Sequence, residues 1–187
     1  MTARMHDQQL AQDQTQGQTQ RPAPHHARAF VALGANLGNA VATVQSAIEA
    51  LRQLPHTQVE AVSPLYRTAP VGLTHQPDFI NGVVELHTAL PPYALLEALF
   101  TIEAQHGRER LYHHSPRTLD LDLLMYDDLV QHDPVLTLPH PRMHERAFVL
   151  MPLAVIAADL MIPDHGPVAG LLPMVADQRI QLMEHPS

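Results

Sequence analysis

The spacing of apolar residues along the chain distinguishes predicted helices from predicted strands. Residues 29–33 form a short apolar run, and a turn rich in Gly and Asn follows at 34–39. The apolar residues after this turn recur three or four positions apart: Val41, Val44, Ala47, Ile48 and Leu51. This spacing predicts a strand at 29–33 and an amphipathic helix that is capped by Asn39 and ends near Pro55.

The rest of the pattern continues the same alternation of strands and helices. It predicts, in order, a strand at 59–66, a long loop at 67–77, a strand at 79–88, a helix opened by Pro91 and Pro92 and ended near Gly107, a strand at 119–126 and a helix at 145–160. The order β-α-β-β-α-β is that of the ferredoxin-like unit. The predicted fold class is therefore α+β, a ferredoxin-like βαββαβ sheet with helices and additional C-terminal elements.

Residues 1–27 differ in composition from the rest of the chain. Their apolar residues are few, Pro22 and Pro24 follow, and glutamine is frequent: Gln8, Gln9, Gln12, Gln14, Gln16, Gln18 and Gln20. Such a segment buries too little apolar surface to offset the entropy lost on ordering. We expect a disordered extension at 1–27 and one functional domain at 28–187, with no internal repeat or later linker.

Composition limits the class of protein. The chain has 187 residues, 45% of them hydrophobic, a formal charge of −8 and no cysteine. These values predict one globular core, no disulfide or thiolate metal site, and no broad electrostatic binding of nucleic acid. The sequence shows neither a run of about 18 apolar residues nor a signal peptide, so we expect no membrane span and a cytoplasmic location. A monomer is the default expectation.

All 11 basic side chains are arginine, because the chain contains no lysine. A Walker-type phosphate loop and a pyridoxal Schiff base both need lysine, so these mechanisms are excluded. Arginine forks suit phosphate oxygens, and several arginines gather in one part of the sequence: Arg108, Arg110, Arg117, Arg142 and Arg146. Ordinary surface ion pairs are the competing interpretation.

The segment Asp120-Leu121-Asp122 lies within the same region. In a strand alternate side chains share a face, so the two carboxylates lie side by side and the neighbouring leucines fill the opposite face. Mg²⁺, which prefers hard oxygen ligands, would compensate the two like charges. A solvated acidic edge strand is the simpler alternative.

The chain has 14 histidines, which raises the question of a zinc site. His140 and His144 are four positions apart, but Pro141 follows His140 directly, so the two do not lie on one regular helix. No third ligand is specified by spacing, and His144 is expected to cap or flank the helix that begins near Glu145.

Several segments together resemble the 6-hydroxymethyl-7,8-dihydropterin pyrophosphokinase family of folate biosynthesis. They are, in order, ALGANLG at 32–38, SPLYRTAPVG at 63–72, QPDFINGVV at 76–84, GRER at 107–110, PRTLDLDLL at 116–124 and LPHPRMHERAFVLMPL at 138–153. The resemblance runs from about Phe30 to Pro163. It implies that the protein transfers pyrophosphate from ATP to the hydroxymethyl group of 6-hydroxymethyl-7,8-dihydropterin and releases AMP.

The resemblance also implies roles for charged residues. By similarity, Asp120 and Asp122 hold two Mg²⁺ ions with ATP, and either carboxylate is a candidate acceptor for the hydroxymethyl proton. The other roles implied for this part of the site are phosphate contacts during catalysis by Arg108 and Arg117, a similar contact by Arg110, and ATP contacts by His140 and Arg146.

For the pterin, the family has two aromatic positions that sandwich the flat ring, matched here by Phe79 and Phe148. Thr68, Val71 and Asn81 match positions around its hydrogen-bonding edge, where an amide both donates and accepts. Core packing is the alternative for each phenylalanine, and backbone capping is the alternative for the amide.

The sequence departs from the family pattern in the loop 109–115, where Leu111, Tyr112, His113 and His114 replace the usual basic residues and tryptophan. Ser115, Phe100 and Ala69 are further departures. They touch nucleotide contacts and loop closure, so a pterin-binding relative that has lost efficient catalysis remains an alternative to the active enzyme. An RNA-binding ferredoxin-like domain is a more distant alternative, because the chain is acidic.

Overall fold

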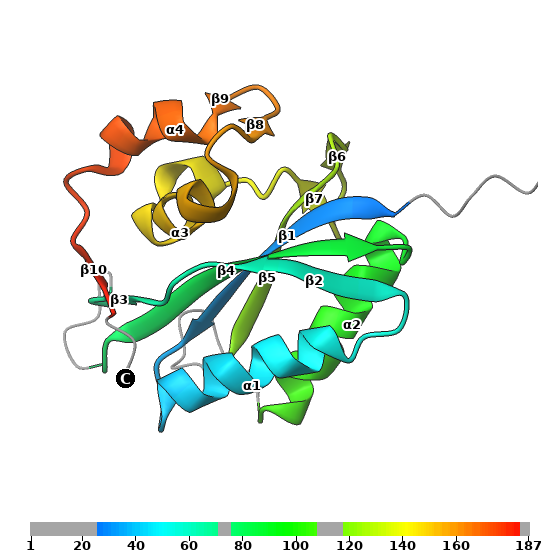
Figure 1. Ribbon diagram of the computed structural model, residues 1–187, viewed down its shortest axis with the longest axis horizontal. Coiled ribbons are helices and arrows are strands. Elements are labelled where there is room, and N and C mark those ends of the chain that lie inside the picture. Colours follow the sequence, from blue (N-terminus) through cyan, green and yellow to red (C-terminus); the bar gives the residue numbers. More distant parts are fainter. Residues whose placement is uncertain (1–25, 71–75, 108–117, 184–187) are drawn as a thin grey trace, which may run out of the picture.

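The computed structural model describes residues 26–70, 76–107 and 118–183. Its centre is a six-stranded antiparallel sheet with the order β10-β3-β4-β1-β5, in which β2 also pairs with β4 (Figure 1). The strands are β1 at Ala27–Ala35, β2 at Thr57–Val62, β3 at Tyr66–Thr68, β4 at Phe79–Thr88, β5 at Asp120–Tyr126 and β10 at Ile180–Leu182.

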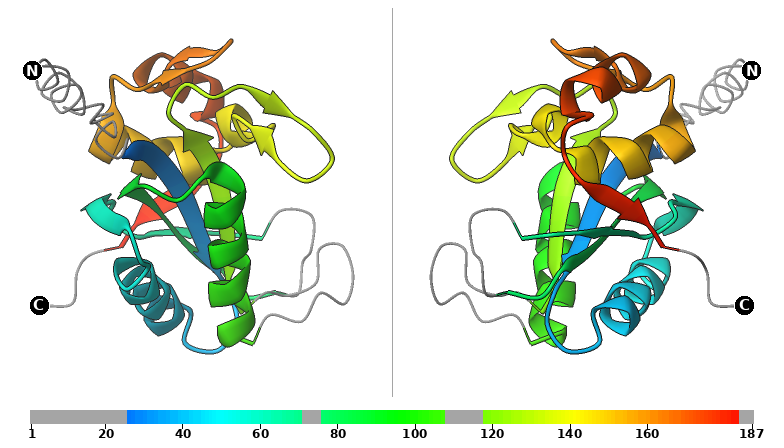
Figure 2. Two further views of the ribbon diagram at one scale, coloured as in Figure 1. Left: turned by 90° about the vertical axis from the view of Figure 1, so that its right-hand side faces the viewer. Right: turned by 90° about the vertical axis from the view of Figure 1, so that its left-hand side faces the viewer.

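Two layers of helices cover the two faces of this sheet (Figure 2). Helices α1 at Ala40–Arg52 and α2 at Pro92–Gln105 pack on one face against the inward residues of β1 and β5, such as Val31, Leu33 and Leu121. Helix α3 at Ala147–Ala157 packs on the other face against Phe30 and Val83. The central strands are thus buried on both faces, which explains the uninterrupted apolar run of β1.

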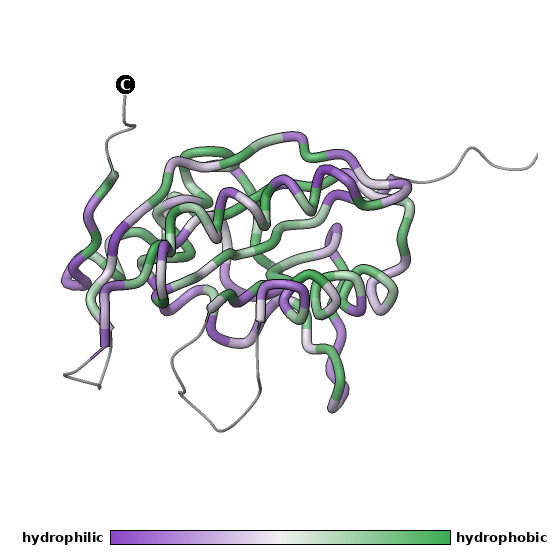
Figure 3. The backbone as a smooth tube through the Cα atoms, turned by 90° about the horizontal axis from the view of Figure 1, so that it is seen from below, coloured by the Kyte–Doolittle hydropathy of each residue, from purple (hydrophilic) through white to green (hydrophobic). Residues whose placement is uncertain are grey.

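The predicted β-α-β-β-α-β unit is confirmed as β1-α1-β2-β4-α2-β5, with the short strand β3 in addition, and several helix boundaries are also confirmed. The Asn39 side chain caps α1 by accepting a hydrogen bond from the Ala42 N–H at 3.1 Å. Helix α2 begins at Pro92, and Gly107 follows its end with a φ of 77°, a conformation that glycine adopts without strain. Figure 3 views the molecule from the side on which α1 and α2 lie, and it shows hydrophobic and hydrophilic residues alternating along the backbone.

Three boundaries differ from the prediction. The strand expected at 59–66 is two strands, β2 and β3, separated at Ser63, whose hydroxyl accepts a hydrogen bond from the Val83 N–H at 2.9 Å. The loop expected at 67–77 starts later, because Arg67 and Thr68 continue β3. The helix expected at 145–160 is a 3-10 turn, η1 at Met143–Glu145, followed by α3 from Ala147.

The C-terminal region adds elements to both layers. They are the hairpin of β6 at Gln131–His132 and β7 at Thr137–Leu138, the hairpin of β8 at Met161–Ile162 and β9 at Gly166–Pro167, the short helix α4 at Val168–Leu171 and the 3-10 turn η2 at Leu172–Val175. Strand β10 then returns to the edge of the main sheet beside β3. Within the described ranges, every helix is too short or too polar to cross a membrane.

Candidate active site

The two aspartates of β5 lie on one face of the sheet, as predicted. Leu119, Leu121 and Leu123 are buried and belong to the core beneath α1 and α2. Asp120 and Asp122 alternate with these leucines and are both partly exposed on the opposite face. The apolar residues therefore fix the orientation of the strand, and the carboxylates point together toward the α3 side.

The pairing of β1 with β4 and β5 brings a third polar residue to this face. Gly34 of β1 lies opposite Asn81 of β4 and opposite Asp120 of β5. Residues directly opposite in antiparallel strands point to the same face, so Asn81, Gly34 and Asp120 form one row across three strands. With strands about 4.8 Å apart, Asn81 and Asp120 begin roughly 10 Å apart, and only a glycine lies between them. A Cβ at Gly34 would lie 3.4 Å from the Asn81 side-chain oxygen.

The Asn81 amide contacts its neighbour on β3 through its nitrogen. Its Nδ2 donates a hydrogen bond to the Thr68 hydroxyl at 2.9 Å, which directs Oδ1 toward Gly34. Thr68 itself lies opposite Phe79 at the start of β4. Thr68, Phe79 and Asn81, which the sequence assigned together, are therefore neighbours on the same face as the aspartates.

His140 lies within electrostatic reach of this face. Its backbone N–H donates to the Leu124 carbonyl of β5 at 2.8 Å, and its Nδ1 accepts from the Arg142 N–H at 3.2 Å. Burial lowers the pKa of His140; the nearby Asp122 opposes that shift, and the charge of Arg146 adds to it. A neutral imidazole whose Nδ1 accepts a hydrogen bond carries its proton on Nε2.

We predict that His140 in the folded protein titrates below its ordinary pKa of 6.5. Because the unfolded chain then takes up this proton more readily, the contribution of His140 to stability is complete above about pH 6.5 and is lost as the pH falls toward the folded pKa. An NMR titration, with the His140 signal assigned by its loss in His140→Gln, measures this directly. A midpoint at or above 6.5 would show that burial does not control this group.

Arg146 and Phe148 stand at the start of α3. Arg146 is the residue that precedes the first turn, and its guanidinium carbon lies 5.4 Å from the centre of the Phe148 ring. Phe148 is partly buried against the core that α3 forms with the sheet. The two residues therefore belong to one local arrangement, next to the segment that carries His140.

His144 does not cap α3. The N-cap is Arg146, without a side-chain capping bond, and His144 instead lies in η1 with its ring stacked on His165. The ring centres are 3.7 Å apart and the planes differ by 16°. His144 thus flanks the helix and contacts the β8–β9 hairpin.

Glu103 of α2 binds the backbone of the strand that carries the two aspartates, and the sequence did not predict this role. Its side chain is 2% exposed, and Oε1 accepts a hydrogen bond from the Leu121 N–H at 2.8 Å. Leu121 separates the two aspartates, so this buried carboxylate helps to fix the strand that carries them. The signal in the sequence was its position, four residues after Leu99 on the apolar stripe of the helix.

Part of the predicted site lies outside the described residues. This applies to Val71, Arg108, Arg110 and Arg117, and to the unusual loop 109–115. The described residues bring together Asp120, Asp122, Asn81, Thr68 and Phe79 on one face of the sheet, with His140 near Asp122.

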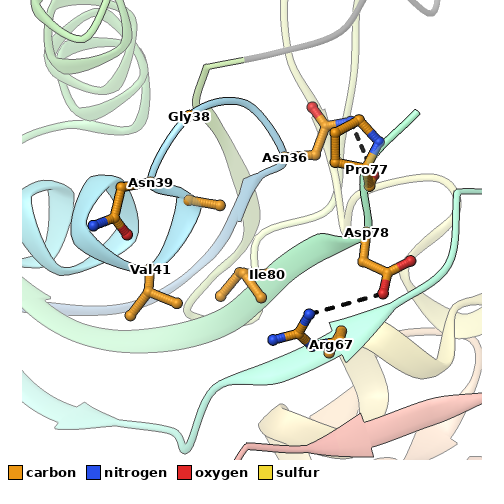
Figure 4. A pocket seen from close by; sticks show the side chains of 9 residues that line it. Asn36, Gly38, Asn39, Val41, Arg67, Pro77, Asp78 and Ile80 are labelled. Atoms are coloured by element: carbon orange, nitrogen blue, oxygen red, sulfur yellow. Dashed lines mark hydrogen bonds and ion pairs between the residues drawn. The ribbon is translucent and has the colours of Figure 1, made fainter. Parts of the chain in front are cut away.

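A separate cleft of about 590 Å³ opens near the start of α1 (Figure 4). Arg67 and Ile80 line it and lie opposite each other in the β3–β4 ladder, so they point away from the face that carries Thr68 and Asn81. Arg67 forms an exposed ion pair with Asp78 at 3.9 Å, and the Asn36 amide donates to the Pro77 carbonyl at 3.4 Å. Among the residues that the structure describes, those of the predicted site do not line this cleft.

Two carboxylates and an amide lie on one face of this α+β sheet, and His140 and Arg146 lie close by, a set of side chains that suits an enzyme acting on a metal-bound phosphate substrate. Comparisons with known proteins define it further. Residues 30–158 match the profile of the 7,8-dihydro-6-hydroxymethylpterin-pyrophosphokinase family. The chain belongs to this family.

Individual relatives agree with the family match. The 2-amino-4-hydroxy-6-hydroxymethyldihydropteridine pyrophosphokinase of Pseudomonas aeruginosa is 48% identical over 145 residues, which cover 78% of this chain and 90% of the relative. The Haemophilus influenzae enzyme of the same name is 40% identical and covers 81% and 95% of the two chains. The sequence-based assignment to this family is confirmed, and the protein is an enzyme of folate biosynthesis that transfers pyrophosphate from ATP to hydroxymethyldihydropterin.

Solved structures show the same fold. The crystal structure of Plasmodium falciparum HPPK-DHPS wild type with SDX-DHP superposes with a TM-score of 0.64 at 12% identity and covers 79% of this chain. The matched region is 44% of that longer chain. At this identity the likeness supports the fold alone, and the predicted ferredoxin-like class is confirmed.

Proposed function

We propose that pyrophosphoryl transfer takes place on the α3 face of the sheet. Asp120 lies there in the same cross-strand row as Asn81, and Asp122 lies in the next row on that face. The observation that carries the proposal is the row Asn81, Gly34, Asp120, which places an amide and a carboxylate on either side of a residue without a side chain. An amide recognises the pterin edge, and a carboxylate pair serves a metal-bound phosphate chain. The two substrates would meet above Gly34.

The carboxylate pair fits Mg²⁺. Within the ranges that the structure describes, no three His, Asp or Glu residues are grouped so as to enclose an ion. Two carboxylates leave most positions of an octahedral ion to phosphate oxygens and water, which is how Mg²⁺ commonly binds with nucleotides. We propose that Asp120 and Asp122 hold two Mg²⁺ ions with ATP. When bound, these ions would neutralise phosphate charge and orient the β-phosphate for in-line attack.

Residues next to the aspartates would bind the rest of ATP. A neutral His140 has a donor at Nε2, and Arg146 supplies a guanidinium fork close enough to lower the pKa of His140. Arg108 and Arg117 are proposed to contact the phosphates as charge moves to the AMP leaving group, with Arg110 in a similar role. Asp120 and Asp122 remain candidates for accepting the hydroxymethyl proton.

The pterin would bind beside the phosphate chain, between Phe79 and Phe148. Stacking on flat rings supplies apolar contact, while the Asn81 side-chain oxygen accepts a hydrogen bond from the pterin edge. The Thr68 hydroxyl is compatible with this role because it accepts a hydrogen bond from the Asn81 Nδ2, which leaves Oδ1 on the side of Gly34. Val71 is proposed to complete this wall.

The remaining expectations concern the state of the protein. We propose a monomer that acts in the cytoplasm, in line with a chain that has no cysteine. Residues 28–187 would form the catalytic domain, and residues 1–27 an extension outside it.

The proposal is tested by resolving the nucleotides formed from ATP and 6-hydroxymethyl-7,8-dihydropterin, with and without EDTA. We expect AMP without ADP, dependence on the pterin, loss of turnover on chelation and recovery when excess Mg²⁺ is added. Turnover that persists in EDTA would contradict the metal assignment. Pterin binding without nucleotide consumption would instead support the relative that has lost catalysis.

A further inference from the structure

The Gln178 side chain holds the backbone on both sides of Arg146. Its Oε1 accepts a hydrogen bond from the Ala147 N–H at 2.9 Å, and its Nε2 donates to the Glu145 carbonyl at 2.7 Å. Arg146 lies between these two bonded residues. The Gln178 amide thus forms one donated and one accepted hydrogen bond with the backbone at 145–147, the same pair of bonds that an adjacent strand would form.

The start of α3 needs such a partner. The first N–H groups of a helix have no acceptor within the helix, and Arg146, as N-cap, has extended backbone angles and no side-chain capping bond. Gln178 supplies the acceptor for the Ala147 N–H from a distant part of the chain, 31 residues away. The backbone that orients the Arg146 side chain is therefore set by a tertiary contact.

The same segment also reaches the other side of the proposed site. Two residues after Gln178, Ile180 begins β10 and lies opposite Thr68 in the β10–β3 ladder. Two residues of extended chain span at most about 7 Å, so Gln178 lies close along the chain to the residue that pairs with Thr68. Figure 2 shows the red C-terminal segment running from the α4 layer down to the edge of the sheet.

We propose that Gln178 is a positioning residue for Arg146, and that segment 178–182 joins the ATP-binding end of α3 to the pterin-binding strand β3. The inference rests on the proposed role of Arg146 in ATP binding. Gln178 lies beyond residue 158, where the family match ends, and the roles assigned to the site so far do not include it. Its effect on substrates is indirect, through the backbone that carries Arg146.

The experiment uses steady-state kinetics of the full chain with three substitutions. Gln178→Met keeps the length of the side chain and removes both hydrogen bonds, whereas Gln178→Glu keeps the acceptor and removes the donor. Gln181→Met is the matched control, because Gln181 is an exposed glutamine of the same segment. We expect KM for ATP to rise roughly fivefold or more in Gln178→Met, less in Gln178→Glu and within about twofold of wild type in the control.

A double-mutant cycle with Arg146→Ala separates positioning from general stabilisation. If Gln178 acts through Arg146, Gln178→Met adds no more than about a twofold change in KM for ATP once Arg146 is alanine. The same fold-change in both backgrounds would overturn the proposal while leaving Arg146 in the site. If Arg146→Ala alone leaves KM for ATP unchanged, the proposed role of Arg146 fails, and the role of Gln178 fails with it.

Discussion

Replacing Asp122 by Asn is expected to lower kcat for AMP formation by a factor of roughly 100 to 1,000, the range found when one preorganised electrostatic group is removed. The substitution preserves the shape of the side chain and removes its charge. Asp122 is partly exposed on the site face and lies near His140, so the loss falls on the metal and phosphate region and not on the apolar core. Kinetics at saturating ATP and Mg²⁺, with circular dichroism to verify folding, measure the effect.

Asp128→Asn is the matched control. Asp128 is exposed, follows the end of the same strand and lies away from the paired row. Its substitution removes the same charge and is expected to leave kcat within about twofold of wild type, as for most surface sites. Equal losses in the two variants would mean that the total charge of the chain, and not its position on β5, governs the rate.

Gly34→Val is expected to raise the dissociation constant of the pterin by at least about tenfold, because the valine side chain would fill the space between Asn81 and Asp120 and remove stacking and hydrogen bonds of the pterin. Valine suits a strand, so the fold should tolerate it. Gly34→Ala should give a smaller rise. Pterin titrations monitored by fluorescence or calorimetry give the binding constant, and thermal unfolding gives the stability.

Gly170→Ala provides the steric control for the alanine variant. In both glycines the nearest atom to an added Cβ lies at 3.4 Å, but Gly170 is in α4, beyond the site. We expect unchanged pterin binding in Gly170→Ala. If Gly34→Val bound pterin as tightly as wild type, the substrate would not occupy the space above Gly34.

The sequence predicted much of the geometry around the proposed site because the signals for that geometry are local. The alternation of Asp120 and Asp122 with leucines is visible in a few residues and follows from the two-residue period of a strand. Asn39 as a helix cap and the proline start of α2 are equally local. The resemblance placed Thr68, Phe79 and Asn81 together, and the β3–β4 register confirms that they are neighbours.

What the sequence did not predict depends on long-range pairing. The role proposed for Gly34 rests on its register with both β4 and β5, which no local pattern specifies. Strand β10 pairs with β3 late in the chain, and the Gln178 side chain, two residues before β10, bonds to the backbone of Glu145 and Ala147, more than 30 residues earlier. Glu103 occupied a helix position that reads as core, and its acceptor role appears only when β5 is packed beside α2.

The most direct test of the account is a crystal structure with 6-hydroxymethyl-7,8-dihydropterin, a non-hydrolysable ATP analogue and Mg²⁺. We predict the pterin above Gly34 with its edge on the Asn81 side-chain oxygen, and metal ions between the Asp120 and Asp122 carboxylates and the phosphates. Ligands bound instead in the cleft lined by Arg67 and Ile80, on the opposite face of the sheet, would contradict the proposed site.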